Sequence, residues 1–421
     1  LFIAGVDALW VDQAKDGSDD KGFTFVKQTD GTYKIGLSPQ NKSYTETLGY
    51  EGFYFGVDPS KKDTRLYLID TNEVTDAQII WKIVSPNAYT TYVAARKQYN
   101  AAVKLGATIE EAQATPGVDS AVVTAAQQAY SNTNTSADEL TAMTEALEKA
   151  IQDAKINNAS IDNPVEILAA QGIATDFADG TCPGWNSTTG AQNKQASNGN
   201  NAADFNVTGN HYENWSGSAF TIGKVYAKPT ELPVGVYKLD ALAFTNVTGG
   251  TYLFAGQAEK MVKSIVITIN EPMELYTYVS GGEVEIGLNV KEKGPNWIGL
   301  DNVYLYYIGC GQAELKKLVE ETMASEPDFG DFYNHALFDT YEAAKTAFQN
   351  AVTEEAMTKA YAEYMSARQA LVESAAAYQK YFDAYQATLD WIDLNQYTIS
   401  GPDMDLLVDY IQADDLEPNE Y

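Results

Sequence analysis

The fold of this chain is decided by residues 297–307, which read WIGLDNVYLYY. They close a region of short strands separated by turn residues, and Val303–Tyr307 is expected to be its last strand. Two segments upstream belong to the same region: ENWSG at residues 213–217 and LPVGVYKL at residues 232–239. In the latter, a Pro-x-Gly turn leads into apolar residues at every second position, as in a half-buried strand. Residues 159–311 are therefore predicted to form a β-sandwich.

The length of 421 residues exceeds that of one domain, which is typically about 100–200 residues. Hydrophobic residues make up 45% of the chain, enough for each module to bury a core. Shifts in composition predict five segments. They are a small β-domain at 1–85, helices at 86–158, the sandwich at 159–311, helices at 312–375, and the truncated start of a further helical module at 376–421.

The charge balance excludes several classes of function. With 28 basic and 58 acidic residues, the net charge is −30, which disfavours nucleic acid and anionic membrane surfaces. Two His and two Cys are too few for a catalytic zinc site. No run of 18 apolar residues is present to span a membrane. We expect an extracellular or outer-membrane-associated chain, processed from a longer protein whose missing ends hold the export signal and the anchor.

The first 85 residues are predicted to be strands. Asp30-Gly31 lies between two β-forming runs and indicates a hairpin. The recurrence of aromatic strands with Asp-Gly-x-Tyr and Trp-x-Ile elements resembles a ricin-like β-trefoil, although only about two of its three repeats fit. Another small β-domain is the alternative.

The helical segments have apolar stripes typical of three-helix bundles. Helices are expected at 88–104, 118–130 and 137–155, and again at 313–324, 339–352 and 354–373. Ser136 and Glu139 have the spacing of a capping box. We interpret the bundles as spacers without chemistry of their own.

The motifs of the central region carry a more specific resemblance. In order, they are Glu-Asn-Trp-x-Gly-x-Ala-Phe, Leu-Pro-x-Gly-x-Tyr, Ala-x-Ala-Phe and Trp-x-x-x-Asp-Asn-Val-x-Leu. The region resembles the galactose-binding-domain-like jelly rolls found in surface glycan-handling proteins of Bacteroides-type bacteria, which also alternate with three-helix bundles. The resemblance implies a domain that binds sugar, protein or neither.

Sugar rings stack on Trp or Tyr and need Asn, Asp or Gln for their hydroxyls. Three loops offer such pairs, and the candidate ligand-binding residues are Trp185, Asn186, Tyr212, Trp215, Asn296 and Trp297. Within the family pattern, Trp215 and Trp297 are expected to fill the sandwich core rather than to contact a ligand, and Trp185 and Tyr212 are the better candidates for ligand contact. The Asn-rich run at 192–201 is either a solvated loop or a further sugar contact.

Two structural features follow from the resemblance. Such sandwiches often hold a calcium ion, for which Asp176, Asp179 and Asp204 are available oxygen ligands. Cys182 and Cys310 lie near the two ends of the module, and they either form a disulfide or remain two free thiols.

The sequence holds no Gly-x-Ser-x-Gly, His-Glu-x-x-His or phosphate-loop motif, and no enzyme is expected. We predict a non-catalytic carbohydrate-binding or adhesion protein whose partner is a glycan or glycoprotein, or an accessory region of a larger glycan-processing protein. A structural surface protein that mediates protein–protein assembly without sugar binding is the alternative.

Overall fold

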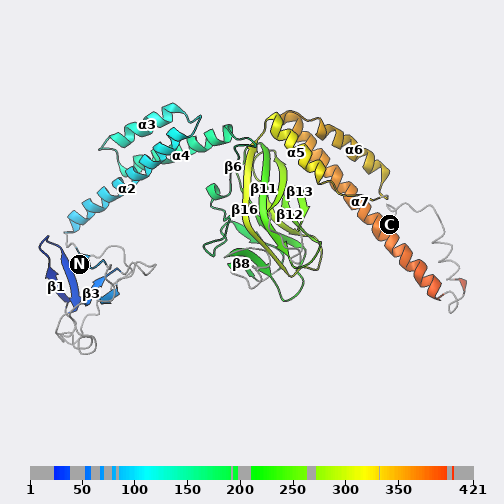
Figure 1. Cartoon of the computed structure of the whole chain (residues 1–421), viewed down its shortest axis with the longest axis horizontal. Helices are drawn as coiled ribbons and strands as arrows, with labels where there is room; N and C mark the ends of the chain where they lie inside the picture. Colours follow the sequence, from blue (N-terminus) through cyan, green and yellow to red (C-terminus); the bar gives the residue numbers. More distant parts are fainter. Residues whose placement is uncertain are drawn as a thin grey trace. The chain divides into compact units, whose positions relative to one another are not determined.

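The computed structural model describes residues 23–37, 53–57, 67–70, 78–81, 85–190, 193–197, 210–262, 272–330, 332–395 and 401–402. The chain divides into two compact units, residues 1–110 with 121–147 and residues 111–120 with 148–421. Along the chain, strands are followed by helices, then by a strand-rich region and by further helices (Figure 1). None of the helices in the described ranges combines the length and apolar character needed to cross a bilayer.

The first unit begins with one antiparallel sheet of five strands. These are β1 (Phe23–Lys27), β2 (Tyr33–Leu37), β3 (Phe53–Gly56), β4 (Tyr67–Asp70) and β5 (Ile80–Trp81). The sheet order is β1-β2-β3-β4, with β5 paired to β2. The predicted hairpin at Asp30-Gly31 is confirmed, since Lys27 pairs with Tyr33 and Gly31 turns the chain at a φ of 83°.

Three helices come next: α2 (Pro86–Ala114), α3 (Ser120–Ser131) and α4 (Ala137–Asn157). The capping box at the start of α4 is confirmed, because Glu139 N donates to Ser136 Oγ at 3.2 Å and Ser136 N donates to Glu139 Oε2 at 2.8 Å. Leu105, Ala126 and Leu147 are buried, as their apolar spacing requires. The first half of α2 instead exposes apolar side chains, among them Tyr92 and Tyr99.

Residues 165–309 form two antiparallel sheets. The first has the order β14-β11-β16-β9-β8, with β6 (Val165–Glu166) also paired to β16, and the second has the order β13-β12-β15-β10-β7. A single turn of 3-10 helix, η2 (Ala169–Gln171), follows β6. The other strands are β7 (Trp185–Ser187), β8 (Asn193–Ser197), β9 (His211–Trp215), β10 (Gly223–Ala227), β11 (Gly235–Thr245), β12 (Thr251–Ala255), β13 (Ala258–Met261), β14 (Met273–Val279), β15 (Ile286–Val290) and β16 (Trp297–Gly309). Residues 263–271, between β13 and β14, lie outside the described residues.

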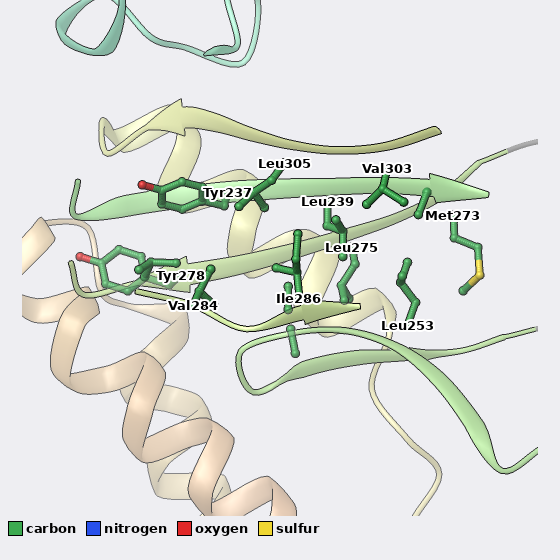
Figure 2. Close-up of a cluster of buried hydrophobic side chains, with 14 of the residues drawn as sticks. Tyr237, Leu239, Leu253, Met273, Leu275, Tyr278, Val284, Ile286, Val303 and Leu305 are labelled. Carbon is green, nitrogen blue, oxygen red and sulfur yellow. The ribbon is translucent and has the colours of Figure 1, made fainter. Parts of the chain in front are cut away.

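The core lies between the two sheets. Tyr237 and Leu239 on β11, and Leu305 on β16, face Leu253 and Ile286 of the other sheet (Figure 2). These side chains are at most 1% exposed, as alternate residues of strands in a two-layer fold should be.

One irregularity in β16 changes which residues face the core. Leu242 of β11 pairs with Asp301, but Asp240 pairs with Tyr304, so β16 holds one extra residue at this point. Asn302 has a φ of 48°, and the strand bulges there. Even-numbered residues such as Leu300 point inward before the bulge, and odd-numbered residues such as Leu305 after it.

Helices α5 (Gln312–Ala324), α6 (His335–Gln349) and α7 (Glu354–Asn395) complete the second unit. The core of the sandwich continues into them through Leu315, Leu318 and Tyr361. Tyr361 Oη lies 3.1 Å from Thr277 Oγ1, and Tyr278 Oη lies 2.9 Å from Thr358 Oγ1. Helix α7 is continuous, so the division expected between residues 375 and 376 falls inside it.

Candidate functional site

The candidate site lies on the outer face of the first sheet, where β9 runs beside β16. Tyr212 and Asn214 of β9 point into the sandwich, and Asn214 bridges the sheets by accepting a 2.7 Å hydrogen bond from Thr189. By alternation, His211, Glu213 and Trp215 therefore face outward. Trp215 pairs with Trp297 and Glu213 with Gly299, which brings predicted and unpredicted residues to one surface.

Aromatic rings are packed side by side on this face. The Phe244 ring lies 5.3 Å from that of Trp297 and 5.5 Å from that of His211, centroid to centroid. Phe244 pairs with Gly299 of β16, where the missing side chain makes room for its ring. We call His211, Glu213, Phe244, Trp297 and Asp301 the outer-face cluster.

The polar groups of the outer-face cluster lie close together, and two of them are hydrogen-bonded. Trp297 Nε1 donates to Glu213 Oε2 at 3.1 Å, which fixes the indole. The same carboxylate oxygen lies 3.6 Å from His211 Nε2, and His211 is fully buried with neither ring nitrogen hydrogen-bonded among the described residues. Burial raises the pKa of the Asp301 carboxyl to about 6, so the cluster combines aromatic surface with titratable groups.

Trp215 is the most exposed of the aromatic side chains on this surface, whereas Trp297 is half-buried. The Trp215 side chain is 44% exposed at the end of β9, directly before the polar turn at Ser216 and Gly217. An indole held at a strand end presents a rigid apolar face, which suits stacking against the C–H patch of a sugar ring.

The side chain of the predicted ligand contact Asn296 is hydrogen-bonded within the protein. Its side-chain nitrogen donates to Ser216 O at 3.1 Å, and its side-chain oxygen accepts a hydrogen bond from the Asn246 amide. Asn246 Oδ1 in turn accepts from the backbone N–H groups of Asn296 and Trp297. This network fixes the loop beside Trp215, and we call the exposed indole of Trp215 the platform. Asn296 therefore positions the platform, and the side-chain amide of Asn296 is already hydrogen-bonded within the protein.

Two of the predicted ligand contacts need correction, because the structure places Trp185 and Tyr212 in the core. Trp185 is 4% exposed and Tyr212 is 0% exposed. Their rings pack together with that of Phe177, and Trp185 Nε1 donates to Ala174 O at 2.8 Å. An aromatic side chain sealed between two sheets is not available to a ligand.

Asn186 is separated from the other candidates. It follows Trp185 on β7 and pairs with Tyr226 in the second sheet, so its exposed side chain faces the opposite side of the sandwich from the outer-face cluster. The Asn-rich run is not simply a loop, since Asn193–Ser197 is strand β8, paired with β9. Its remaining residues lie outside the described ranges.

Neither a calcium site nor a disulfide is found among the described residues. Asp179 accepts a 2.8 Å hydrogen bond from Thr181 N and Asp176 one of 3.2 Å from Ala178 N, while Asp204 lies outside the described residues. Where the structure describes the chain, no three His, Cys, Asp or Glu side chains are grouped to hold a metal ion. Both cysteines are free thiols, so of the two alternatives the free thiols hold and the disulfide does not.

The geometry explains why Cys182 and Cys310 remain apart. Cys182 O accepts a 3.3 Å hydrogen bond from Trp185 N, the Trp185 ring lies 6.0 Å from that of Tyr212, and Tyr212 pairs with Leu300 on β16. Cys310 follows β16 ten residues beyond Leu300, which at about 3.3 Å per residue is roughly 30 Å along the strand. A disulfide needs Cα atoms within about 7 Å.

His211, Phe244 and Asp301 were not among the candidate ligand-binding residues. His211 directly precedes the predicted Tyr212, and strand alternation alone would have put it on the face of Trp215. Phe244 lies on β11, 55 residues before Gly299, and no local pattern joins the two. The bulge at Asn302, which sets the position of Asp301, carries no signal that we recognised.

No family model matches the chain, and no curated protein matches it either. Among solved structures, the carbohydrate-binding module TmCBM61, in complex with β-1,4-galactotriose, is 18% identical, with 31% of this chain and 93% of that one covered and a TM-score of 0.24. A cleaved adhesin domain of Lys-gingipain from Porphyromonas gingivalis is 13% identical, over 34% of this chain and 98% of that one, with a TM-score of 0.24.

A third structure, the CBM51-2 and INT domains of ZmpB from Clostridium perfringens, is 15% identical. It covers 46% of this chain and 45% of that one with a TM-score of 0.20. No functional statement about this chain follows from likenesses of this size.

Proposed function

We propose that this chain is a non-catalytic carbohydrate-binding or adhesion protein, displayed on a cell surface or secreted. Its sandwich is in this proposal a galactose-binding-like jelly roll, as the sequence resemblance implies. The observation that carries the proposal is Trp215, an indole 44% exposed at the end of a strand, supported by the Trp297–Glu213 hydrogen bond and by the Asn296 network.

The chemistry of the outer-face cluster favours binding over catalysis. A glycosidase needs two carboxyl groups that reach the substrate. Glu213 is 7% exposed and Asp301 is 5% exposed, and the oxygen that Glu213 offers is already hydrogen-bonded to Trp297. These groups support the platform from below, whereas Trp215 is the side chain that a ligand can contact.

A glycan array with the whole chain tests the proposal. Wild-type protein should bind defined glycans, and Trp215→Ala should weaken that binding at least about tenfold, which corresponds to about 1.4 kcal/mol. Trp391→Ala is the matched control, since Trp391 is also 44% exposed but lies on α7. Equal losses in the two variants, or no glycan bound by the wild type, would refute the assignment to Trp215.

A second candidate function has an observation of its own. Tyr92, Tyr99 and Val103 on α2 are 56%, 67% and 54% exposed, and their spacing of seven and four residues places them on one helix face. An apolar helix face of this kind suits protein–protein assembly. If assembly is the function, Tyr99→Lys should abolish concentration-dependent association in light scattering while Trp215→Ala leaves it unchanged.

A further inference from the structure

A cleft of about 920 Å³ lies between the sandwich and the helices of the second unit. One wall comes from β12, β13 and β14, with Tyr252 and Tyr276, and the other from the end of α5 and from α7, with Arg368 and Gln369. Binding pockets for small ligands are typically about 300–1,000 Å³. The cleft is thus large enough for one or more sugar units, and it is separate from the platform at Trp215.

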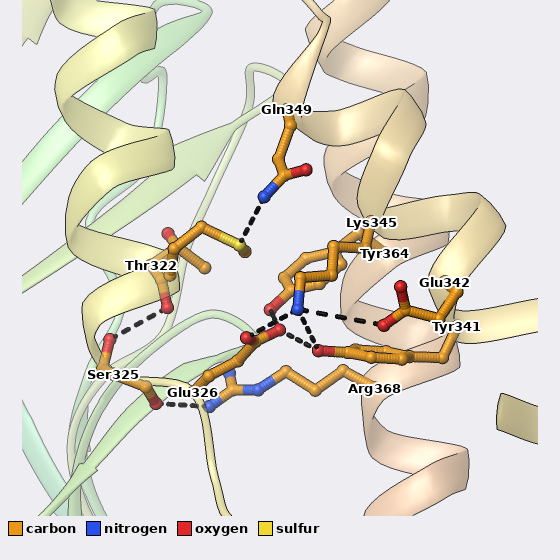
Figure 3. A network of polar contacts seen from close by, with 10 residues as sticks. Thr322, Ser325, Glu326, Tyr341, Glu342, Lys345, Gln349, Tyr364 and Arg368 are labelled. Carbon is orange, nitrogen blue, oxygen red and sulfur yellow. Dashed lines mark hydrogen bonds and ion pairs between the residues drawn. The ribbon is translucent and has the colours of Figure 1, made fainter.

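The acidic side chains of the cleft are mostly compensated. Four lining glutamates pair with lysines: Glu259 with Lys291 at 2.5 Å, Glu274 with Lys238 at 3.3 Å, Glu321 with Lys317 at 2.6 Å, and Glu326 with Lys345 at 2.9 Å. Glu326 also accepts hydrogen bonds from Tyr341 and Tyr364 (Figure 3). The fifth, Glu373, accepts a 2.8 Å hydrogen bond from Gln369.

Besides Lys260, whose Nζ donates to the backbone oxygen of Glu274 at 3.2 Å, the other cation that lines the cleft is Arg368. Its Nη2 donates to Ser325 O at 3.0 Å, at the end of α5 (Figure 3). Its Nε is buried without a hydrogen-bond partner, and no carboxylate of the described residues forms an ion pair with the guanidinium. In a chain of net charge −30, an arginine without an acidic partner is unexpected. A guanidinium has five N–H donors in a planar fork, and a carboxylate is the group that matches the fork.

The opposite wall offers aromatic surface. Lys291 Nζ lies 5.0 Å from the centre of the Tyr252 ring, and Lys317 Nζ lies 5.4 Å from that of Tyr276. These cation–π contacts hold two half-buried rings in place at the cleft. A tyrosine ring with nearby amides, here those of Gln257 and Gln369, is suited to the apolar face and the hydroxyls of a sugar.

From this arrangement we propose that the cleft is a second binding site, which takes a saccharide unit bearing a carboxylate, such as a uronic acid. The carboxylate binds Arg368, and the sugar ring lies against Tyr276 or Tyr252. The choice of a sugar over another carboxylate ligand rests on the proposed function. Repulsion by distant acidic residues is weak at physiological salt, where the Debye length is about 8 Å, so the local charge of Arg368 decides.

Calorimetric titration of the whole chain tests this site with a matched pair of probes. A short oligogalacturonate should bind, and its fully methyl-esterified form, which lacks the charge, should bind at least about tenfold more weakly. Arg368→Gln should abolish the difference between the two probes. Tyr276→Leu, which keeps the apolar packing, should weaken both, and Trp391→Ala, on α7 outside the cleft lining, should change neither.

The outcomes separate this site from the platform. Equal binding of the two probes, or an Arg368→Gln variant that still prefers the acid, overturns the proposal. So does a polyglutamate peptide that binds with the same dependence on Arg368 while oligogalacturonate does not, because the occupant is then a peptide. Failure of the Trp215→Ala test on the glycan array refutes only the platform, since that variant leaves the cleft intact.

Discussion

The Phe244 ring lies across Gly299, the residue that pairs with it on the neighbouring strand β16. A Cβ atom on Gly299 would collide with three atoms of the ring, although nothing in the backbone conformation at this position demands glycine. Since the ring also packs against Trp297 and His211, one missing side chain determines how the outer-face cluster is built.

Gly299→Ala should therefore destabilise the sandwich. Overpacking of a well-filled site costs typically about 1–3 kcal/mol, and the displaced Phe244 ring should also shift the indole of Trp297. The measurements are the thermal unfolding midpoint and the near-ultraviolet circular dichroism of the indoles. Gly217→Ala is the control, because a Cβ there meets nothing within 4 Å, and it should change stability by less than about 0.5 kcal/mol. Equal effects of the two variants would contradict this account.

Asp301 should make the chain less stable as the pH rises from about 4 to about 6. Its folded pKa of about 6 lies above the ordinary value of 3.8, so the folded state holds the proton more tightly. Below both pKa values the carboxyl is protonated in both states and does not change the free energy of unfolding. Above both values, its ionisation lowers the free energy of unfolding by about 3 kcal/mol. Asp301→Asn should accordingly raise the unfolding free energy at pH 7 and have little effect at pH 3.5.

Unfolding midpoints at the two pH values check this expectation. Asp179→Asn serves as a comparison of opposite sign, because hydrogen bonds from Thr181 lower the pKa of that exposed carboxyl. Its carboxylate stabilises the fold above the ordinary pKa and loses this effect as the pH falls. A variant Asp301→Asn that is equally destabilised at both pH values would show that the charge is not the cause.

The regular parts of this fold could be predicted from local pattern. Residues such as Leu239 and Leu305 alternate along their strands and are buried. The capping box at Ser136 and the hairpin at Gly31 depend only on residues a few positions apart. In each case the information lies within one element, where spacing and propensity are sufficient.

The candidate site was harder to predict because it depends on register between strands. Trp215 and Trp297 are 82 residues apart and meet only because β9 pairs with β16. Whether an aromatic residue is available to a ligand or fills the core depends on which face of the sheet it occupies. On the same strand, Tyr212 is buried in the core and Trp215 is exposed. The cleft at Arg368 needs the helices to dock against β14, a contact that the sequence does not encode locally.

The two cysteines should behave as independent thiols. Without reductant, the unfolded chain should bind two equivalents of an alkylating reagent, and the reductant should leave the thermal midpoint unchanged. In the folded chain Cys310 should react slowly, because burial raises its pKa and lowers its thiolate fraction. Mass spectrometry after tryptic digestion distinguishes the sites, and a peptide linking Cys182 to Cys310 would contradict the structure.

The buried contact between Thr277 Oγ1 and Tyr361 Oη should couple the sandwich to the helices. It joins β14 to α7 at 3.1 Å, with Thr277 only 1% exposed, so removing either group leaves the other buried without its partner. Thr277→Val and Tyr361→Phe should each cost about 1 kcal/mol or more, and the double variant should cost less than their sum. Chemical denaturation of the four proteins gives the coupling energy, while hydrogen exchange should show both β14 and α7 opening more often in each single variant. Strictly additive losses, with faster exchange confined to one of the two elements, would mean that sandwich and helices are stabilised separately.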